Sequence, residues 1–168
     1  FGDFPFVDLA FNPWDLQQFA IVDIKGNFGV GRIPKSCKRG NKIKLSRELG
    51  GSIFDAEELS NWKKIEWSSS HDRLLVMDRS QIVELNFEQD WQLQVVQAKT
   101  WSDLRDYRKL DDDFGVILTS AEIIVIRTAD DSEHIVREIS WKHDLDPRDP
   151  TLRLALQKVE YNSKCSVI

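Results

Sequence analysis

The segment from Phe6 to Ile33 restricts the fold most, because it reads as three consecutive antiparallel β-strands. Aromatic and β-branched residues, which suit the half-buried surface of a sheet, gather in three runs: Phe6–Phe11, Phe19–Val22 and Phe28–Ile33. Residues 12–15 and 23–27 separate the runs and carry turn-forming residues. Proline cannot donate to a strand ladder, and glycine supplies the positive φ that a tight hairpin needs. A meander of this kind is a building unit of all-β repeat folds.

The same three-strand pattern recurs twice further along the chain. The later runs lie at 64–67, 74–78 and 81–87, and then at 107–110, 114–119 and 122–128. The turns between the second and third strands, at Asp23, Asp78 and Ser120, lie 55 and 42 residues apart. The copies match in spacing rather than in residue identity.

A fourth strand is expected after each triplet. The candidates are the alternating segments Lys42–Ser46, Trp91–Val96 and Ile135–Trp141. Short helices are expected at Asp55–Leu59, which opens with an Asp cap, and at Trp101–Arg105. Leucine alternates with other residues over Leu152–Val159, which predicts that a further strand begins there.

Four antiparallel strands that recur at about 40 to 50 residues are typical of β-propeller blades. The predicted fold is therefore all-β, part of a WD-like propeller with approximate blades at residues 6–49, 64–99 and 106–141 and the start of another at 150–168. The main alternative is a β-sandwich, whose strands alternate without a blade-length period. Three blades cannot close a ring of about four to eight. Residues 1–168 are accordingly expected to be a segment excised from a longer protein.

Composition excludes several other classes of protein. The 168 residues are 41% hydrophobic, enough for a core, and contain no apolar run of membrane-spanning length and no signal-peptide pattern. A net charge of −5 argues against a surface that binds nucleic acid throughout. Cys37 and Cys165 are expected to be free thiols, because two separated cysteines make neither a disulfide framework nor a metal site.

No pattern typical of catalysis or cofactor binding stands out. His71, His134 and His143 are not spaced as zinc ligands and are interpreted as solvated turn residues. No glycine-rich phosphate loop follows a strand. The acidic residues at 111–113 and at 144, 146 and 149 lack the glycine and distal glutamate of a calcium loop. The chain is therefore expected not to be an enzyme and to hold no metal or cofactor.

Basic residues cluster after the first triplet. Six of them lie within 13 residues: Lys35, Lys38, Arg39, Lys42, Lys44 and Arg47. On an acidic domain such a cluster is a candidate contact for phosphates or for an acidic partner. The alternative is a flexible solvated loop.

The six tryptophans fall into two groups. Trp67, Trp91 and Trp141 lie on predicted strands and are expected in the core. Trp14, Trp62 and Trp101 lie in turns or before strands, where they either pack between blades or anchor a partner.

Five segments resemble one known family. They are DLAFNPWDLQQFAIVDIKGN (8–27), GRIPK (31–35), EELSNWKKIEW (57–67), VVQAKTWSDLRDY (95–107) and ISWKHDLDP (139–147). They closely resemble the β-propeller subunit of the fungal RNA polymerase I core factor, whose metazoan counterpart is a TBP-associated subunit of the selectivity factor. The likeness runs from about Phe6 to Val159 and is weakest through 36–47 and 129–133. The Trp-Asp that closes ordinary WD repeats is missing, so generic WD-repeat functions are not implied.

The resemblance implies a non-enzymatic scaffold for RNA polymerase I transcription. Such a subunit is nuclear, concentrated in the nucleolus, and works with a helical-repeat subunit and a TFIIB-like subunit. The assembly recognises the core promoter of ribosomal DNA, contacts TBP and recruits RNA polymerase I, so promoter DNA is expected to be reached through the assembly.

Two other functions stay open at this point. One is a direct DNA-binding module that works through the basic loop 35–47. The other is a generic β-propeller adaptor of a different complex, which purification without polymerase I factors would favour.

The DNA-binding hypothesis predicts the effect of reversing charge in the loop. If Lys38, Arg39 and Lys42 contact phosphates, changing all three to Glu weakens promoter binding by the assembled factor and flattens its salt dependence, because fewer counterions are released. Binding titrations at several salt concentrations measure the slope. A slope unchanged from the wild type would remove the hypothesis.

Overall fold

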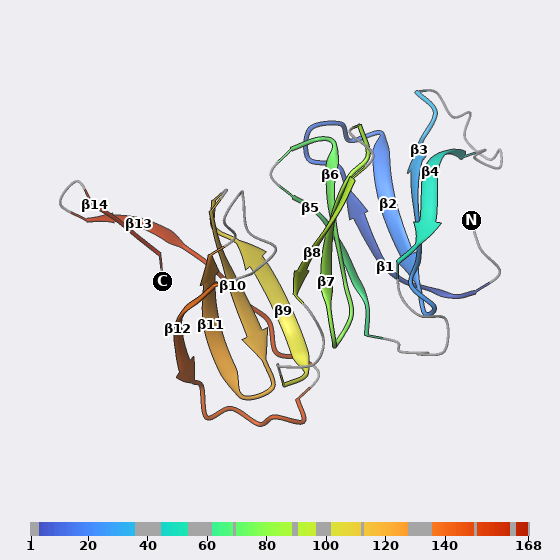
Figure 1. Ribbon diagram of the computed structural model, residues 1–168. Helices are drawn as coiled ribbons and strands as arrows, with labels where there is room; N and C mark the ends of the chain where they lie inside the picture. Colours follow the sequence, from blue (N-terminus) through green and yellow to red (C-terminus); the bar gives the residue numbers. More distant parts are fainter. Residues whose placement is uncertain are drawn as a thin grey trace. The chain divides into compact units, whose positions relative to one another are not determined.

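A computed structural model describes residues 4–35, 45–53, 62–68, 70–88, 91–96, 102–111, 113–127, 136–149, 151–161 and 164–167; at 91–96, 158–161 and 164–167 only the backbone is described. These residues form β-strands and turns (Figure 1). Within them, no helix has the length and apolar character that crossing a bilayer requires. The chain divides into two compact units, Phe1–Lys99 and Thr100–Ile168.

Three antiparallel sheets each contain four strands that are consecutive in sequence. The first sheet consists of β1 (Phe6–Phe11), β2 (Gln18–Asp23), β3 (Asn27–Arg32) and β4 (Ser46–Ser52). The second consists of β5 (Lys64–Trp67), β6 (Arg73–Met77), β7 (Ile82–Asn86) and β8 (Trp91–Val96). The third consists of β9 (Leu104–Lys109), β10 (Phe114–Thr119), β11 (Glu122–Arg127) and β12 (Val136–Lys142), and the hairpin β13 (Lys158–Tyr161) and β14 (Lys164–Val167) follows it. Strand order within each sheet equals chain order, as the propeller prediction requires.

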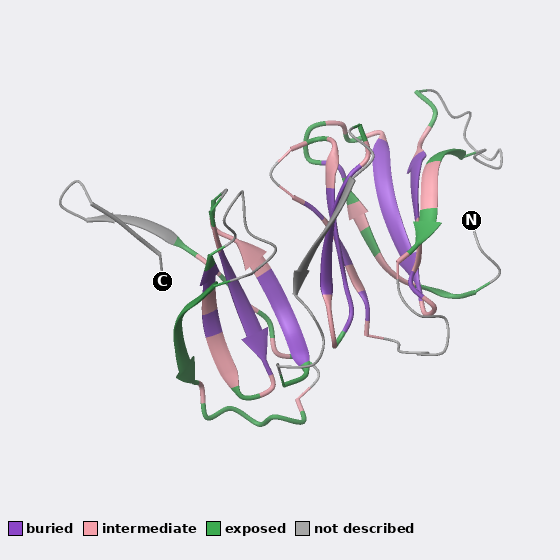
Figure 2. Ribbon diagram, in the orientation of Figure 1, coloured by how far each residue is buried: buried purple, intermediate pink, exposed green. Residues whose placement is uncertain are grey.

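The first unit is held together by an apolar core between its two sheets. Figure 2 shows that the buried stretches follow the central strands. The cluster contains Ala20, Val22, Val30, Ile65, Trp67, Leu74, Val76, Val83 and Leu85. Burying such side chains stabilises a fold by roughly 25 cal/mol per Å² of apolar surface, so each sheet depends on the other to cover its face.

One carboxylate fixes the two sheets in register. Asp8 Oδ2 accepts a hydrogen bond from the Ile65 backbone N–H at 2.9 Å, and Asp8 Oδ1 accepts one from the Leu9 N–H at 2.9 Å. Two residues along β5, the Trp67 indole Nε1 donates to the Ala10 carbonyl at 3.2 Å. The first strand of the second sheet therefore lies beside the first strand of the first sheet.

In the second unit, the third sheet is buried along β9, β10 and part of β11. Leu104, Ile117, Ile124 and Ile126 are each at most 1% exposed. By contrast, β12 is exposed at every one of its seven positions. The third sheet thus has a well-packed inner part and an uncovered outer strand.

A capping side chain ends the second strand of each sheet. Asp23 Oδ1, Asp78 Oδ1 and Thr119 Oγ1 each accept backbone N–H groups from the turn that follows. In the first of these turns Gly26 has a φ of 80°, as the hairpin prediction requires. The recurring turn is therefore confirmed; in the third sheet its capping residue is Thr119, directly before the turn at Ser120.

The fourth strand predicted over Lys42–Ser46 is only partly tested, because residues 42–44 lie outside the described residues. Strand β4 begins at Ser46, and Leu45 lies outside it. Alternation could not reveal β4 because Gly50 and Gly51 carry no side chain. A Cβ at Gly51 would lie 3.1 Å from the Phe28 ring, a close contact that favours glycine there. The other two predicted fourth strands are confirmed as β8 and β12.

The helical turn predicted over Trp101–Arg105 is also wrong, because β9 already begins at Leu104, which pairs with Thr119. Asp55–Leu59 lies outside the described residues. The strand predicted to begin at Leu152 begins at Lys158. Leu152–Gln157 alternates between half-buried and exposed residues, as a strand would, but belongs to none of the described ladders.

The Asp78 cap generates a prediction about local stability. Asp78 is 3% exposed and its Oδ1 accepts the Ser80 N–H, the Ser80 hydroxyl and the Gln81 N–H at 2.7–2.9 Å. Asp78→Ala removes the acceptor of these three hydrogen bonds, at a cost of about 1–3 kcal/mol. Hydrogen exchange of the β6–β7 hairpin in the intact protein should accelerate by at least about fivefold. Asp78→Asn retains an acceptor oxygen and is the control; equal exchange in the two variants would contradict the capping role.

Candidate partner-binding site

Polar side chains close the end of the first sheet where β1 turns into β2. Asn12 is fully buried; its Nδ2 donates to Gln18 Oε1 at 2.6 Å and to the His71 carbonyl at 3.3 Å. Gln18 Nε2 in turn donates to Glu48 Oε2 at 2.7 Å. This network joins the β1–β2 turn to β4 and to the first turn of the second sheet.

Arg32 on β3 extends the network. Its Nε donates to Glu48 Oε1 at 2.6 Å, and its Nη1 pairs with the Asp15 carboxylate. The hydrogen bond from Arg32, followed by the Gln17 N–H, holds the pKa of Asp15 below its usual value. Burial raises the pKa of Glu48, but the hydrogen bonds from Arg32 and Gln18 outweigh burial and lower it overall. Both acids are therefore ionised at neutral pH and offset the charge of Arg32.

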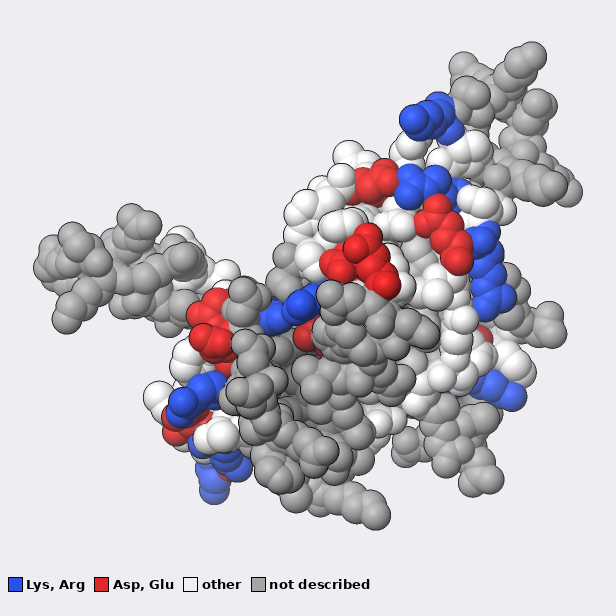
Figure 3. All heavy atoms as spheres, turned by 45° about the horizontal axis from the view of Figure 1, so that its top comes forward, with Lys and Arg blue, Asp and Glu red and all other residues white. Residues whose placement is uncertain are grey.

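The predicted basic loop begins beside this network. Lys35 and Arg47 are exposed, whereas Lys38, Arg39, Lys42 and Lys44 lie outside the described residues. Figure 3 shows basic and acidic side chains side by side on the visible face of the described residues, rather than one continuous basic patch. The role of the loop in binding phosphates stays a prediction.

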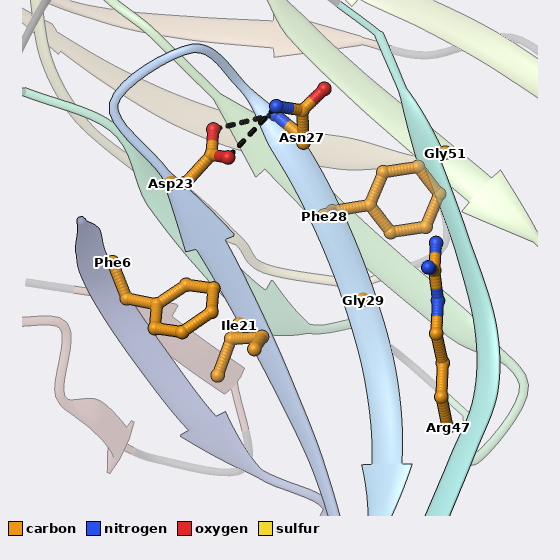
Figure 4. Close-up of a pocket in the computed structure, with 8 residues that line it drawn as sticks. All are labelled: Phe6, Ile21, Asp23, Asn27, Phe28, Gly29, Arg47 and Gly51. Carbon is orange, nitrogen blue, oxygen red and sulfur yellow. Dashed lines mark hydrogen bonds between the residues drawn. The ribbon is translucent and has the colours of Figure 1, made fainter. Parts of the chain in front are cut away.

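A pocket of about 240 Å³ lies on the first sheet, next to Arg47 (Figure 4). Its lining residues are Phe6, Ile21, Asp23, Asn27, Phe28, Gly29, Arg47 and Gly51. Asp23 is bonded to Asn27 within the turn, with Asn27 Nδ2 donating to Asp23 Oδ2 at 2.8 Å. The pocket therefore combines apolar side chains with the Arg47 guanidinium and the bonded pair of Asp23 and Asn27.

Among the described residues, no three His, Cys, Asp or Glu side chains converge as a metal-ion site would require. His71 Nε2 lies 3.2 Å from Glu88 Oε1 at the surface, and His143 Nε2 lies 3.1 Å from the Thr119 carbonyl. Asp111, Asp146 and Asp149 accept N–H groups of their own turns. His134 and the side chains of Cys37 and Cys165 lie outside the description.

The tryptophans do not all lie where the sequence placed them. Trp67 is in the core as predicted, at 6% exposure and edge-on to Phe87. Trp141 is 48% exposed, so its predicted core position is wrong in the described residues; it lies on β12, whose face nothing described covers. Trp14 is 53% exposed and Trp62 is half-buried. The side chains of Trp91 and Trp101 are not described.

The sequence interpretation missed two exposed apolar surfaces. One follows β1 and its turn: Phe4, Phe6, Leu9, Phe11, Trp14 and Leu16. The other follows β12 and the segment after it: Val136, Ile139, Trp141 and Leu145. Alternation marks such residues as facing inward, but it does not show whether a neighbouring sheet is present to cover them.

Comparison with known proteins identifies the family. The family model described as "Rrn6, beta-propeller" matches residues 1–168. The chain belongs to the Rrn6 β-propeller family. The RNA polymerase I-specific transcription initiation factor RRN6 of Saccharomyces cerevisiae is 58% identical over 160 residues, which cover 94% of this chain and 18% of that protein.

A solved structure agrees with this assignment to the Rrn6 family. The crystal structure of the S. cerevisiae core factor contains a chain that matches with a TM-score of 0.65 and 47% identity, over 91% of this chain and 25% of that one. The predicted resemblance and the predicted β-propeller fold are therefore confirmed. The present chain spans about a fifth of the curated relative.

The Arg32 network generates a prediction about pH. Glu48→Gln should lower the melting temperature of the intact protein at pH 7, by the equivalent of less than about 1 kcal/mol because the pair is partly exposed. Because the pKa of Glu48 is lower in the folded protein, the ionised carboxylate stabilises the fold at pH values above the unfolded pKa, about 4.5 for Glu. This stabilisation is lost as the pH falls through the folded pKa. The difference between wild type and variant should therefore shrink below about pH 4.5.

Thermal melts from pH 7 to pH 3.5, a range chosen to span the titration of carboxylates, measure this difference. The matched control is the same substitution in an Arg32→Met background, where its effect should be reduced. A difference that is independent of pH would contradict the role of the carboxylate charge.

Proposed function

We propose that this chain is the β-propeller part of a non-enzymatic scaffold subunit in a core promoter factor for RNA polymerase I. The observation that carries the proposal is the 58% identity with S. cerevisiae RRN6 across 94% of the chain. Because the chain spans 18% of that relative, the role of the whole protein is part of the proposal.

The geometry of the described residues supports a scaffold. Four-stranded sheets with capped turns and a buried polar network, such as Asn12 with Gln18, form a rigid frame that presents loops and edges to other proteins. The exposed apolar residues and the guanidinium of Arg47 are suited to binding proteins, since aromatic residues and arginine dominate interface energetics.

The proposed partners follow from the family. They are the other core-factor subunits, one with helical repeats and one like TFIIB, together with TBP and RNA polymerase I. Promoter DNA of the ribosomal genes is reached through the assembly, in the nucleolus. Of the predicted basic cluster, Lys35 and Arg47 are the described members, and neighbouring Arg32 is offset by Asp15 and Glu48.

A chimera tests the proposal. Residues 6–161 of this chain replace the matching segment of S. cerevisiae RRN6, in cells that depend on the chimera for ribosomal RNA synthesis. The chimera should be recovered with the core-factor subunits and should support near-normal synthesis of ribosomal RNA.

The control chimera carries Val76→Asp. It places an unpaired charge at a position with 0% exposure and should abolish both activities through misfolding. A wild-type chimera that accumulates to normal levels in the nucleus, yet is recovered without the other subunits, would contradict the proposal.

A further inference from the structure

The turn between β1 and β2 exposes a group of apolar side chains. Leu16 is 75% exposed, more than any other large apolar side chain of the described residues, and Trp14 is 53% exposed. Pro13, which precedes them, is exposed as well, and Figure 2 shows much of this turn as exposed. Neighbouring exposed apolar residues that include a tryptophan are typical of a surface that binds another protein.

This turn lies beyond the end of the first sheet and not on its face. The ladder between β1 and β2 ends where Phe11 is opposite Phe19. A sheet that packs against this face covers strand residues such as Leu9 and Phe11, whereas the turn lies at the end of the sheet, where loops are presented to other molecules. The packing of one sheet on another therefore does not explain the exposure of Trp14 and Leu16.

Hydrogen bonds hold the turn in one conformation. Asn12 Oδ1 accepts the Trp14 N–H at 2.9 Å, and Asp15 Oδ1 accepts the Gln17 N–H at 3.1 Å. The Gln17 carbonyl accepts the Ile33 N–H at 2.7 Å, which ties the turn to the end of β3. An element that is ordered before it binds loses little conformational entropy on binding, so more of its contact energy appears as affinity.

The charge beside the turn is positive. Asp15, which lies between the two exposed apolar residues, forms an ion pair with Arg32. Its pKa is lowered mainly by the hydrogen bond from Arg32 and, in smaller part, by the charge of Lys35, so Lys35 lies near the turn. Lys35 is exposed, and the sequence from residue 35 to residue 47 contains six basic residues and no acidic one.

We propose that Pro13, Trp14 and Leu16 insert into an apolar pocket with an acidic rim on another protein subunit of the assembly. The pocket buries the apolar side chains, and its acidic rim faces Lys35. Nucleic acid suits the turn less well, because a phosphate backbone has no apolar surface to cover Leu16 and would lie close to the Asp15 carboxylate.

This inference rests on the proposed scaffold role, since it requires a partner subunit. It does not require that this subunit belong to the RNA polymerase I machinery. The two proposals can therefore fail separately.

Photo-crosslinking in the purified assembly identifies what covers the turn. A benzophenone amino acid at position 14 of the intact protein should crosslink to another protein subunit, at a site that mass spectrometry maps to apolar residues beside Asp or Glu. The control is position 79, which is exposed in the β6–β7 turn. The β5–β6 turn lies beside the β1–β2 turn, since Asn12 donates to the His71 carbonyl, so position 79 lies at the other end of β6 and should not reach that site.

The crosslinked species separates the possible outcomes. A crosslink from position 14 to nucleic acid, crosslinks only within the same chain, or no crosslink would overturn the inference. A crosslink to an apolar and acidic site on a subunit unrelated to RNA polymerase I would support the inference and contradict the proposed function.

Truncating the tryptophan tests whether it anchors the contact. Trp14→Ala in the intact protein should raise the dissociation rate of the crosslinked subunit by at least about tenfold, as expected for a buried interface tryptophan. Trp14→Phe retains an aromatic ring and should have a much smaller effect. Because Trp14 is exposed, the melting temperature of the intact protein without its partners should not change. Dissociation at the wild-type rate, or a loss of binding that follows a lowered melting temperature, would overturn the inference.

Reversing the charge beside the turn tests the acidic rim. Lys35→Glu should slow association with the same subunit several-fold at low salt, and the difference should disappear as salt is raised, because charges at the rim of an interface act mainly on the association rate. Arg79→Glu makes the same change of charge at the other end of β6 and is the control. Equal association rates for the two variants, or faster association of Lys35→Glu, would overturn the inference.

Discussion

The carboxylate at the third position of an inner strand is the interaction on which the arrangement of sheets depends. Apolar packing between two sheets is strong but non-directional, so it does not by itself fix how one sheet lies on the next. The Asp8 carboxylate bonds a backbone N–H of its own strand and one of the next sheet, Ile65. Hydrogen bonds to a charged acceptor are stronger and geometrically more demanding than neutral ones.

Fixing the register matters because the side-chain period of a strand is two residues. A slip of β5 by one residue against β6 would turn Ile65 and Trp67 from the core to the opposite face, and the bond from Ile65 to Asp8 opposes that slip. The same acceptor recurs as Asp106, and Glu66 occupies the third position of β5. A scaffold built in this way keeps its loops in fixed positions, which is what an assembly of several subunits requires of a non-catalytic member.

Most strands could be predicted from the sequence, because alternating apolar and polar residues and turn-forming residues depend directly on local structure. Strand β4 could not, since Gly50 and Gly51 leave no alternation to read. Leu104 likewise gave no local sign that it pairs with Thr119 of β10. The exposure of Trp141 could not be predicted either. An aromatic residue on a strand is buried only when another sheet covers it, and that depends on residues distant in sequence.

The candidate site was less predictable than the fold. Charge alone pointed to the basic loop. Arg32, however, pairs with Asp15 and Glu48, which come from other parts of the sheet and are brought to it only by folding. An acidic residue at the third position of each first strand was visible in the sequence at Asp8, Glu66 and Asp106. Its meaning became apparent only when Ile65 and Leu154 were found to donate to two of these residues.

An experimental density map of the intact protein in its assembly would test the central claim most directly. The account predicts that the Asp8 and Asp106 carboxylates lie within hydrogen-bonding distance of the Ile65 and Leu154 backbone nitrogens, and that successive four-stranded sheets repeat around one axis. A map in which residues 152–157 leave β9, or in which the sheets form two facing layers without a common axis, would contradict it.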